Sequence, residues 1–214
     1  AGPFKYADDY EQQIMFDLPE YWIGRTPVTN AQYKRFIDAN PGQQVPFTSN
    51  GQDKPYCWDE RSRTFPPHKA EHPVVLVSWD DAKAFCDWAG LILPTDEQWV
   101  KAARGTTGFR WPWGSESPTP EHANFDGNVG STTPVGQYSP KGDSPYGCVD
   151  MFGNVQEWTM SWHIADRAPI LRGISWLSNT TLAKGIAFRS YNDRSTRVRQ
   201  GGFRVVELLS DPGS

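Results

Sequence analysis

The chain has 214 residues and a formal net charge of −4, and 37% of its residues are hydrophobic and 14% aromatic. A chain of this length can bury one sizeable core, so we expect a single domain over residues 1–214. No apolar run approaches the roughly 20 residues of a membrane-spanning helix. We therefore expect a soluble protein without a membrane span, and a cell surface, a virion and the cytoplasm remain open as its location.

Three helices are predicted in chain order, each running from a capping residue to a residue that ends it. They extend from Thr29 to Asn40, from Ser78 to Gly90 and from Thr95 to Gly105. In the second helix Asp81 lies three residues after the cap, as a capping box requires. The apolar positions predicted to face the core are Tyr33, Phe36 and Ile37, then Ala82, Phe85 and Trp88 or Ala89, then Trp99, Ala102 and Ala103.

After Gly105 the sequence is typical of short strands joined by loops. Gly, Pro, Asn and Asp recur every few residues, and alternating runs such as GFRVVELL are brief. Residues 124–147 form a long connection without periodicity, which needs anchoring by side chains or by an ion. The pattern predicts an α+β fold, with helices ahead of a loop-rich β half.

Two pairs of residues have the chemistry of metal ligands. His68 and His72 have the spacing of a helical metal pair, but prolines on both sides argue against the helix. Asn154 and Glu157 lie three apart in a turn-forming stretch beside Trp158. They are either oxygen ligands of a structural calcium ion or side chains that tie a turn to backbone N–H groups.

Charge is distributed unevenly along the chain. Residues 170–206 hold seven Lys or Arg residues and one acid, so an acidic body carries a basic C-terminal segment. One interpretation is an anionic partner, such as nucleic acid. The other is that the arginines pin loops to the acidic body through ion pairs.

Six motifs occur together in the chain: IGRTPVTNAQYKRF, HPVVLVSWDDAKAFCDWAGLILPTDEQWVKAARG, RWPWG, YGCVDMFGNVQEWT, RGISW and GGFRVV. In this order and spacing, from Tyr21 to Val206, they resemble the sulfatase-modifying-factor family, which includes the formylglycine-generating enzyme. The resemblance implies a variant of the C-type lectin fold, with helices in the N-terminal half and loop-rich antiparallel β structure in the C-terminal half.

Two enzymatic branches of that family are expected to differ from this chain. In the formylglycine-generating enzymes a cysteine pair binds copper and performs the oxidation; the positions that resemble that pair are Thr181 and Ile186, and no cysteine follows Cys148. Neither side chain supplies the soft sulfur that copper(I) and thiol chemistry need. The sulfoxide synthases rely on iron-binding histidines largely in a separate helical domain, which this chain lacks. We therefore predict a protein that is not an enzyme and requires no cofactor, with an oxidoreductase of either kind as the alternative.

A third branch resembles the C-terminal segment more closely. The variable proteins of diversity-generating retroelements use this fold and carry adenine-mutagenised codons at their C-terminal end. Arg172, Trp176, Arg189 and Arg204 match the fixed frame. The positions in the variable blocks are Leu177, Ser178, Asn179, Leu182, Ile186, Phe188, Ser190, Tyr191, Asn192, Thr196, Val198 and Arg199.

This resemblance implies a non-catalytic protein whose diversified segment, about residues 171–206, binds an unknown protein or surface ligand. Apolar members of the variable blocks, such as Phe188 and Ile186, are either exposed anchors of that surface or part of the core. Nucleic acid is not expected as the partner, because the arginines coincide with frame positions.

Overall fold

All three predicted helices form, at the positions that their capping residues indicate. The computed structural model describes the chain except residues 8–12, 164, 166, 180–184 and 210–214. Its α-helices are α1 (Asn30–Ala39), α2 (Trp79–Ala89) and α3 (Asp96–Arg104), and two 3-10 turns cover Gly51–Tyr56 and Gly185–Ala187. Within these described residues, no helix is long and apolar enough to cross a membrane.

Each helix begins with a complete capping box. The side chains of Thr29, Ser78 and Thr95 accept the N–H of the third helical residue, whose own side chain accepts the N–H of the cap. The α2 helix ends at Gly90, whose φ of 70° lies in the left-handed region that favours glycine. Local sequence therefore sets both where these helices begin and where α2 ends.

The central sheet has four strands in the order β6-β5-β4-β7. They are β4 (Gln156–His163), β5 (Ala168–Arg172), β6 (Arg189–Tyr191) and β7 (Gly201–Phe203). The strands β4, β5 and β6 are antiparallel neighbours, whereas β7 runs parallel to β4. This departure from the antiparallel pattern arises because residues 192–200 cross from one edge of the sheet to the other before β7 begins.

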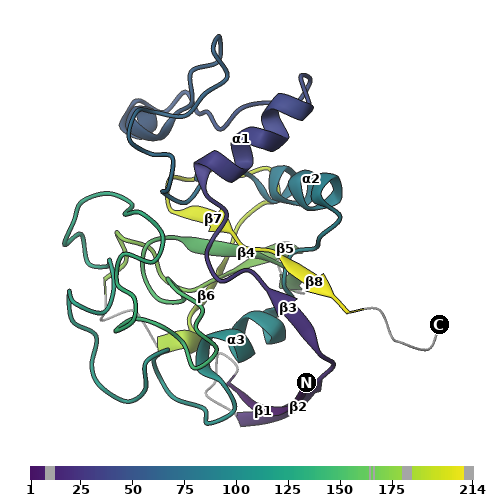
Figure 1. Ribbon diagram of the computed structural model, residues 1–214, viewed down its shortest axis with the longest axis vertical. Coiled ribbons are helices and arrows are strands. Elements are labelled where there is room, and N and C mark those ends of the chain that lie inside the picture. Colours follow the sequence, from purple (N-terminus) through teal and green to yellow (C-terminus); the bar gives the residue numbers. More distant parts are fainter. Residues whose placement is uncertain (8–12, 164, 166, 180–184, 210–214) are drawn as a thin grey trace.

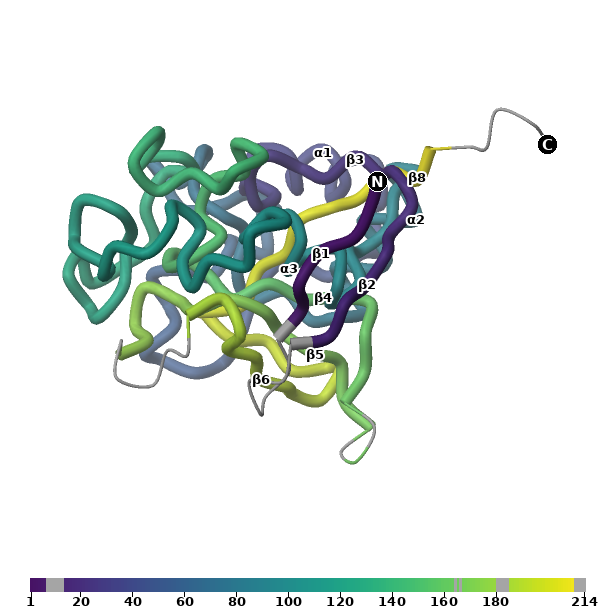
Figure 2. Tube along the Cα trace, turned by 90° about the horizontal axis from the view of Figure 1, so that it is seen from below, coloured from purple at the N-terminus to yellow at the C-terminus, as the bar shows by residue number. Residues whose placement is uncertain are grey.

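Two further strand pairs lie outside this sheet. β1 (Gly2–Ala7) pairs antiparallel with β2 (Gln13–Leu18), and β3 (Tyr21–Ile23) pairs antiparallel with β8 (Val206–Leu208). Figure 2 shows β1 and β2 running alongside each other in front of α3 and β4. The β1–β2 pair was not predicted from the sequence. Phe4 and Tyr6 of β1 are buried with Trp99 of α3, so packing against a distant helix stabilises this pair.

The sheet separates two apolar layers, which Figure 1 shows as α1 and α2 on one side and α3 on the other. Trp158, Leu171 and Phe203 pack with the first two helices. Their strand neighbours Glu157 and Arg172 point to the opposite face, toward α3, because side chains alternate along a strand. The predicted helix faces are buried except at the end of α2, where Trp88 is 44% exposed and Ala89 is exposed because this last turn extends beyond the core.

Side chains anchor the long connection between α3 and β4, which lies on the left in Figure 2. The carboxylate of Asp150 accepts the N–H of Gly136 at 2.8 Å, and the amide oxygen of Asn154 accepts the N–H of Thr133 at 3.1 Å. Asn124 donates from its amide to the carbonyl of Ser131 at 2.8 Å. These bonds satisfy buried backbone groups that no regular secondary structure pairs, and they confirm the predicted anchoring by side chains.

Candidate ligand-binding site

The strand β6 directs the predicted ligand-binding residues to two opposite faces of the sheet. Ser190 lies opposite Leu171 and accepts a hydrogen bond from the side-chain amide of Gln156 at 2.9 Å. Tyr191, the next residue, stacks on His163, with ring centroids 4.4 Å apart and planes 2° from parallel. Adjacent strand residues cannot share a face, so Ser190 and Tyr191 belong to different surfaces.

A cavity of about 270 Å³ opens on the Ser190 side of the sheet, and we name it the Gln156 hollow. It is lined by Gln156, Ile174, Ser175, Leu177, Ser178, Asn179, Phe188 and Gln200. Four of these lining residues, Leu177, Ser178, Asn179 and Phe188, were predicted from the sequence. The lining combines amides and hydroxyls with apolar side chains, which suits a small ligand held by a few hydrogen bonds against an apolar wall.

One wall of the Gln156 hollow is the turn at residues 175–178. The hydroxyl of Ser178 accepts the N–H of Ser175 at 3.0 Å, and the N–H of Ser178 donates to the carbonyl of Ser175 at 3.0 Å. Trp176, in the middle of the turn, is buried and stacks on Tyr56. Leu177 is left 43% exposed at the edge of the hollow. The buried ring of Trp176 therefore anchors the turn, while Leu177 at its tip faces solvent.

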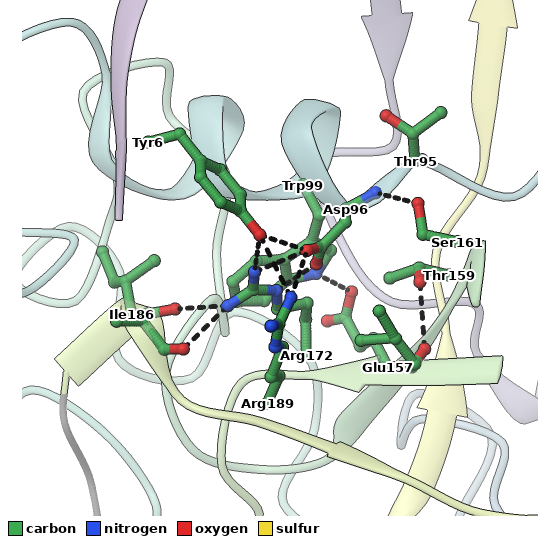
Figure 3. Close-up of polar contacts among 12 residues, drawn as sticks. Tyr6, Thr95, Asp96, Trp99, Glu157, Thr159, Ser161, Arg172, Ile186 and Arg189 are labelled. Atoms are coloured by element: carbon green, nitrogen blue, oxygen red, sulfur yellow. Dashed lines mark hydrogen bonds and ion pairs between the residues drawn. The ribbon is translucent and has the colours of Figure 1, made fainter. Parts of the chain in front are cut away.

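The other wall is supported by a buried polar cluster on the α3 side of the sheet, drawn in Figure 3. Arg172 donates to both carboxylate oxygens of Asp96, to the hydroxyl of Tyr6 at 2.8 Å and to the carbonyl of Ala187 at 2.8 Å. The hydroxyl of Tyr6 also donates to Asp96, and Arg189 lies 3.5 Å from the same carboxylate. We call these four side chains, Tyr6, Asp96, Arg172 and Arg189, the Asp96 network.

The Asp96 network fixes the backbone on either side of Phe188, which lines the Gln156 hollow. Burial favours the protonated form of Asp96, but Arg172 outweighs it and holds the pKa of this carboxyl below its ordinary value. Burial raises the pKa of Tyr6 well above its ordinary value, so its hydroxyl stays protonated and can donate. A charge pair this deeply buried positions its neighbours firmly, because breaking one partner would leave an unpaired charge in the core.

A second buried pair joins Glu157 of β4 to Arg204, the residue that follows β7. Glu157 accepts two hydrogen bonds from Arg204, and its Oε2 also accepts the indole N–H of Trp99 at 2.7 Å. Asn154 is fully buried, and its amide bonds the backbone of Thr133 in both directions. Protein donors thus occupy the oxygens that were predicted to bind calcium at Asn154 and Glu157. Calcium binding there stays a prediction, and the geometry favours the alternative of a turn tied by side chains.

The basic surplus of the C-terminal segment is neutralised inside the molecule. Arginines 172, 189, 194, 197, 199 and 204 each form an ion pair with a carboxylate from earlier in the chain. Arg197 pairs with Asp81 at 2.7 Å and Arg199 with Asp53 at 2.8 Å. This confirms the interpretation in which arginines pin loops to an acidic body, and it removes the charge argument for a polyanionic partner.

The remaining predicted positions lie away from the Gln156 hollow. Ile186 is 1% exposed and packs in the core with α3, so its side chain is not displayed to a ligand. Asn192, Thr196 and Val198 are half-buried along the crossing segment 192–200, as is Arg199. Leu182, like Thr181, lies outside the described residues. The variable-block pattern therefore identified one wall of a cavity rather than a continuous surface.

Sequence reasoning missed several residues of the hollow, namely Gln156, Ile174, Ser175 and Gln200. A usable signal existed for Gln156, since it lies two residues before Trp158 and therefore on the same face of β4. Ser175 lies within the RGISW motif, which indicates the fold family and not a ligand contact. Gln200 enters the lining through the β6–β7 crossing, which no local pattern indicates.

The described residues hold no group of three or more His, Cys, Asp or Glu side chains that could bind a metal ion. His68 and His72 are not on a helix, as their flanking prolines predicted. Burial lowers the pKa of His72 to about 4, and its ring bonds Thr132 at 3.0 Å. The residues present in the described part of the chain therefore do not fit a copper or iron centre of three ligands.

A sheet between two helical layers, with the chain ends joined by β3 and β8 and a loop-rich C-terminal site, is the C-type lectin fold in its formylglycine-generating-enzyme variant. The model of the sulfatase-modifying factor enzyme 1-like domain matches residues 1–209, and the chain belongs to this family. The predicted fold is thus confirmed.

Relatives and solved structures of this family differ in what they are named for. The chain is 37% identical to the hercynine oxygenase of Mycolicibacterium smegmatis over 95% of its own length and 56% of that protein. It is 39% identical to the hercynine oxygenase of Mycobacterium tuberculosis over 72% of its length and 40% of that protein, so it spans only about half of these relatives.

Among solved structures the chain is similar to PvdO from Pseudomonas aeruginosa, with a TM-score of 0.78 and 20% identity over 97% of this chain and 92% of PvdO. It is also similar to Treponema denticola variable protein 1, with a TM-score of 0.69 and 21% identity over 96% of this chain and 91% of that one.

The prediction that this protein is not an enzyme is wrong. It rested on the missing cysteine pair, yet relatives 37–39% identical to this chain are named as oxygenases. The absence of sulfur ligands argues against one copper-dependent reaction, and it says nothing of chemistry whose reactive centre lies on other residues. The likeness to the variable protein, at 21% identity, shows a shared fold and carries no functional weight.

Proposed function

We propose that this chain is the formylglycine-generating-enzyme-type part of an oxygenase similar to the hercynine oxygenases, and that the Gln156 hollow binds its small-molecule substrate. The observation that carries the proposal is the 37% identity to the Mycolicibacterium smegmatis enzyme across 95% of the chain. Identity at this level over nearly the whole chain supports a shared reaction class more strongly than a shared fold does.

The geometry of the hollow supports a substrate site. Its volume of about 270 Å³ suits a small molecule or one part of a larger one. Gln156 donates its side-chain N–H groups to the hydroxyl of Ser190 and to the carbonyl of Gly173, so its side chain is held in one orientation. A polar side chain fixed by its neighbours is preorganised to bind a ligand with little further loss of entropy.

A metal that serves oxygenation would take ligands from outside the described residues, since these offer no three-ligand group. This chain's own contribution is then to bind and orient the substrate through Gln156, Ser178 and Phe188, which line the hollow. Phe188 supplies an apolar face, and the amide and hydroxyl groups set the orientation.

The proposal is tested by titrating the purified chain with hercynine in a calorimeter. We expect the wild-type chain to bind, and Gln156→Leu to weaken binding about tenfold or more, because one substitution removes a positioned hydrogen-bonding group. Gln137→Leu, the same change at an exposed glutamine of the connection between α3 and β4, is the matched control and should bind as wild type. Absence of binding by the wild-type chain, or equal binding by both variants, would overturn the proposal.

A second candidate is ligand binding by a surface varied through a retroelement. It is favoured by the separation of frame and variable residues: Arg172 and Arg204 are fully buried, whereas Leu177 and Tyr191 are 43% and 46% exposed. The test is in the DNA. Under this candidate we expect the gene locus to hold a near-copy of the codons for residues 171–206 that differs at adenines, next to a reverse-transcriptase gene. A locus that holds neither the near-copy nor the reverse-transcriptase gene rejects the candidate.

A further inference from the structure

A second cavity, of about 380 Å³, is bordered by β3 and α3 and shares no lining residue with the Gln156 hollow. Figure 1 shows β3 passing beside α3 on the side of the molecule away from β6. The residues that give this cavity its chemistry are Tyr21, Trp22, Arg25, Lys101 and Tyr146. We name it the Lys101 cavity.

Lys101 is a buried cation without an ion-pair partner among the described residues. It is 3% exposed, because α3 is packed on almost every side. Its ammonium donates to the carbonyl of Gly2 and lies 5.6 Å from the centroid of the Phe4 ring. An ammonium has three N–H donors, so this arrangement leaves donors for a further acceptor.

The electrostatics of Lys101 point to an anion. Burial lowers the pKa of Lys101, and the carboxylate of Asp17 opposes this from beyond ion-pair distance. A buried charge without a partner is costly, and an anionic ligand that accepts from it would offset that cost. Arg25, the other cationic side chain of the lining, already donates to the carbonyl of Gly147 at 3.1 Å and to the hydroxyl of Ser139 at 3.2 Å, and lies 3.7 Å from Asp143. Of these two side chains, Lys101 is therefore the one without an ion-pair partner among the described residues.

Aromatic side chains form the outer part of the Lys101 cavity. Trp22 is 64% exposed and Tyr146 is 56% exposed, although both are large and mostly apolar. Exposed apolar surface that borders a cavity is typical of ligand-binding sites. Flat aromatic walls favour a flat aromatic body, because offset or edge contacts between rings add to the burial of apolar area.

We propose that the Lys101 cavity binds a small aromatic carboxylate. The carboxylate accepts from the ammonium of Lys101, and the ring packs against Trp22 and Tyr146. This site is independent of the substrate site proposed for the Gln156 hollow, so either can fail without the other.

The test compares two probes of nearly the same shape, of which only the first is an anion, indole-3-acetate and indole-3-acetamide, by titration calorimetry on the whole chain. We expect the carboxylate to bind about tenfold more tightly than the amide, which corresponds to one charge-assisted hydrogen bond. Lys101→Met keeps the apolar stem and should abolish this preference, whereas Lys101→Arg should restore it. Arg25→Gln, which removes the other cationic side chain of the lining, should keep the preference.

A variant at the aromatic wall keeps the test decisive if the core substitution unfolds the protein. Trp22 is mostly exposed, so Trp22→Leu should fold, and it should weaken both probes about three- to tenfold because one aromatic contact is lost. Four outcomes would each overturn the assignment. The wild type could bind the two probes equally, or Trp22→Leu could leave binding unaffected. The preference for the carboxylate could also survive Lys101→Met or be lost in Arg25→Gln.

Discussion

The two faces of the segment around β6 differ in how their polar groups are used. On the α3 side, Asp96 and Arg172 are buried and each is bonded by several partners within the chain. On the opposite side, Gln156 borders a cavity and donates to Ser190, and Leu177 is 43% exposed. The basic composition of this segment serves the buried face, and the side chains offered to a ligand are mostly uncharged. A charged segment is thus not by itself a sign of a charged binding site.

The largest effect is expected from breaking the buried face. Arg172→Met leaves the carboxylate of Asp96 buried without its main partner, and should lower the free energy of unfolding by about 3–5 kcal/mol. Chemical denaturation measures this. Arg194→Met is the matched control, because its ion pair with Asp80 is exposed and should contribute no measurable stability. Similar losses in the two variants would contradict the difference between the buried and exposed pairs.

The pH dependence of that loss sharpens the comparison. In the wild type the pKa of Asp96 is lowered, so the pair's contribution is present above about pH 4 and is lost as the pH falls through the folded-state pKa. In Arg172→Met only Tyr6 and Arg189 still oppose the effect of burial, so the pKa of Asp96 should lie higher than in the wild type, and most of the stability gained above about pH 4 should be lost. The difference between the two proteins should therefore shrink from about pH 7 to about pH 3, measured by denaturation at both. A constant difference would show that Asp96 does not carry the effect.

A smaller effect is expected at the edge of the same network. Tyr6→Phe removes a hydroxyl that bonds Asp96 and Arg172, and should cost about 1.5–3 kcal/mol, the range for hydrogen bonds to charged groups. Tyr21→Phe removes one neutral hydrogen bond, to the carbonyl of Gln98, and should cost about 0.5–1.5 kcal/mol. Equal values by thermal or chemical denaturation would mean that the charged partners of Tyr6 add nothing.

The smallest effect on stability is expected on the open face. Leu177→Ser changes an exposed side chain and should alter the free energy of unfolding by no more than about 0.5 kcal/mol. The same variant should weaken hercynine binding several-fold if the Gln156 hollow holds the substrate, as calorimetry can show. A large loss of stability would place Leu177 among the structural residues instead.

The enzymatic prediction shows where a motif can mislead. Thr181 and Ile186 occupy the positions that resemble a cysteine pair, and their side chains lack the sulfur that copper and thiol chemistry need. It was extended to catalysis in general, which the named oxygenase relatives contradict. A missing catalytic group excludes the reaction that needs it, and other reactions on the same fold are unaffected.

What the sequence by itself determined is local or carried by long motifs. Thr29, Ser78 and Thr95 specify the helix starts because capping acts within three residues. The six motifs, spread over nearly the whole chain, specify the fold family. The anchoring of loops by the C-terminal arginines was one of two interpretations that the charge distribution left open.

Tertiary structure alone decided which groups meet. Arg172 bonds Asp96 and Tyr6, which lie 76 and 166 positions away, and no local rule links them. The sheet placed Ser190 beside Gln156 and Tyr191 on the other face, and the packing of α3 buried Lys101 next to β1. Local sequence encodes the conformation of a few neighbouring residues, whereas a site is made where distant segments pack together. The partners of those side chains therefore appeared only in the fold.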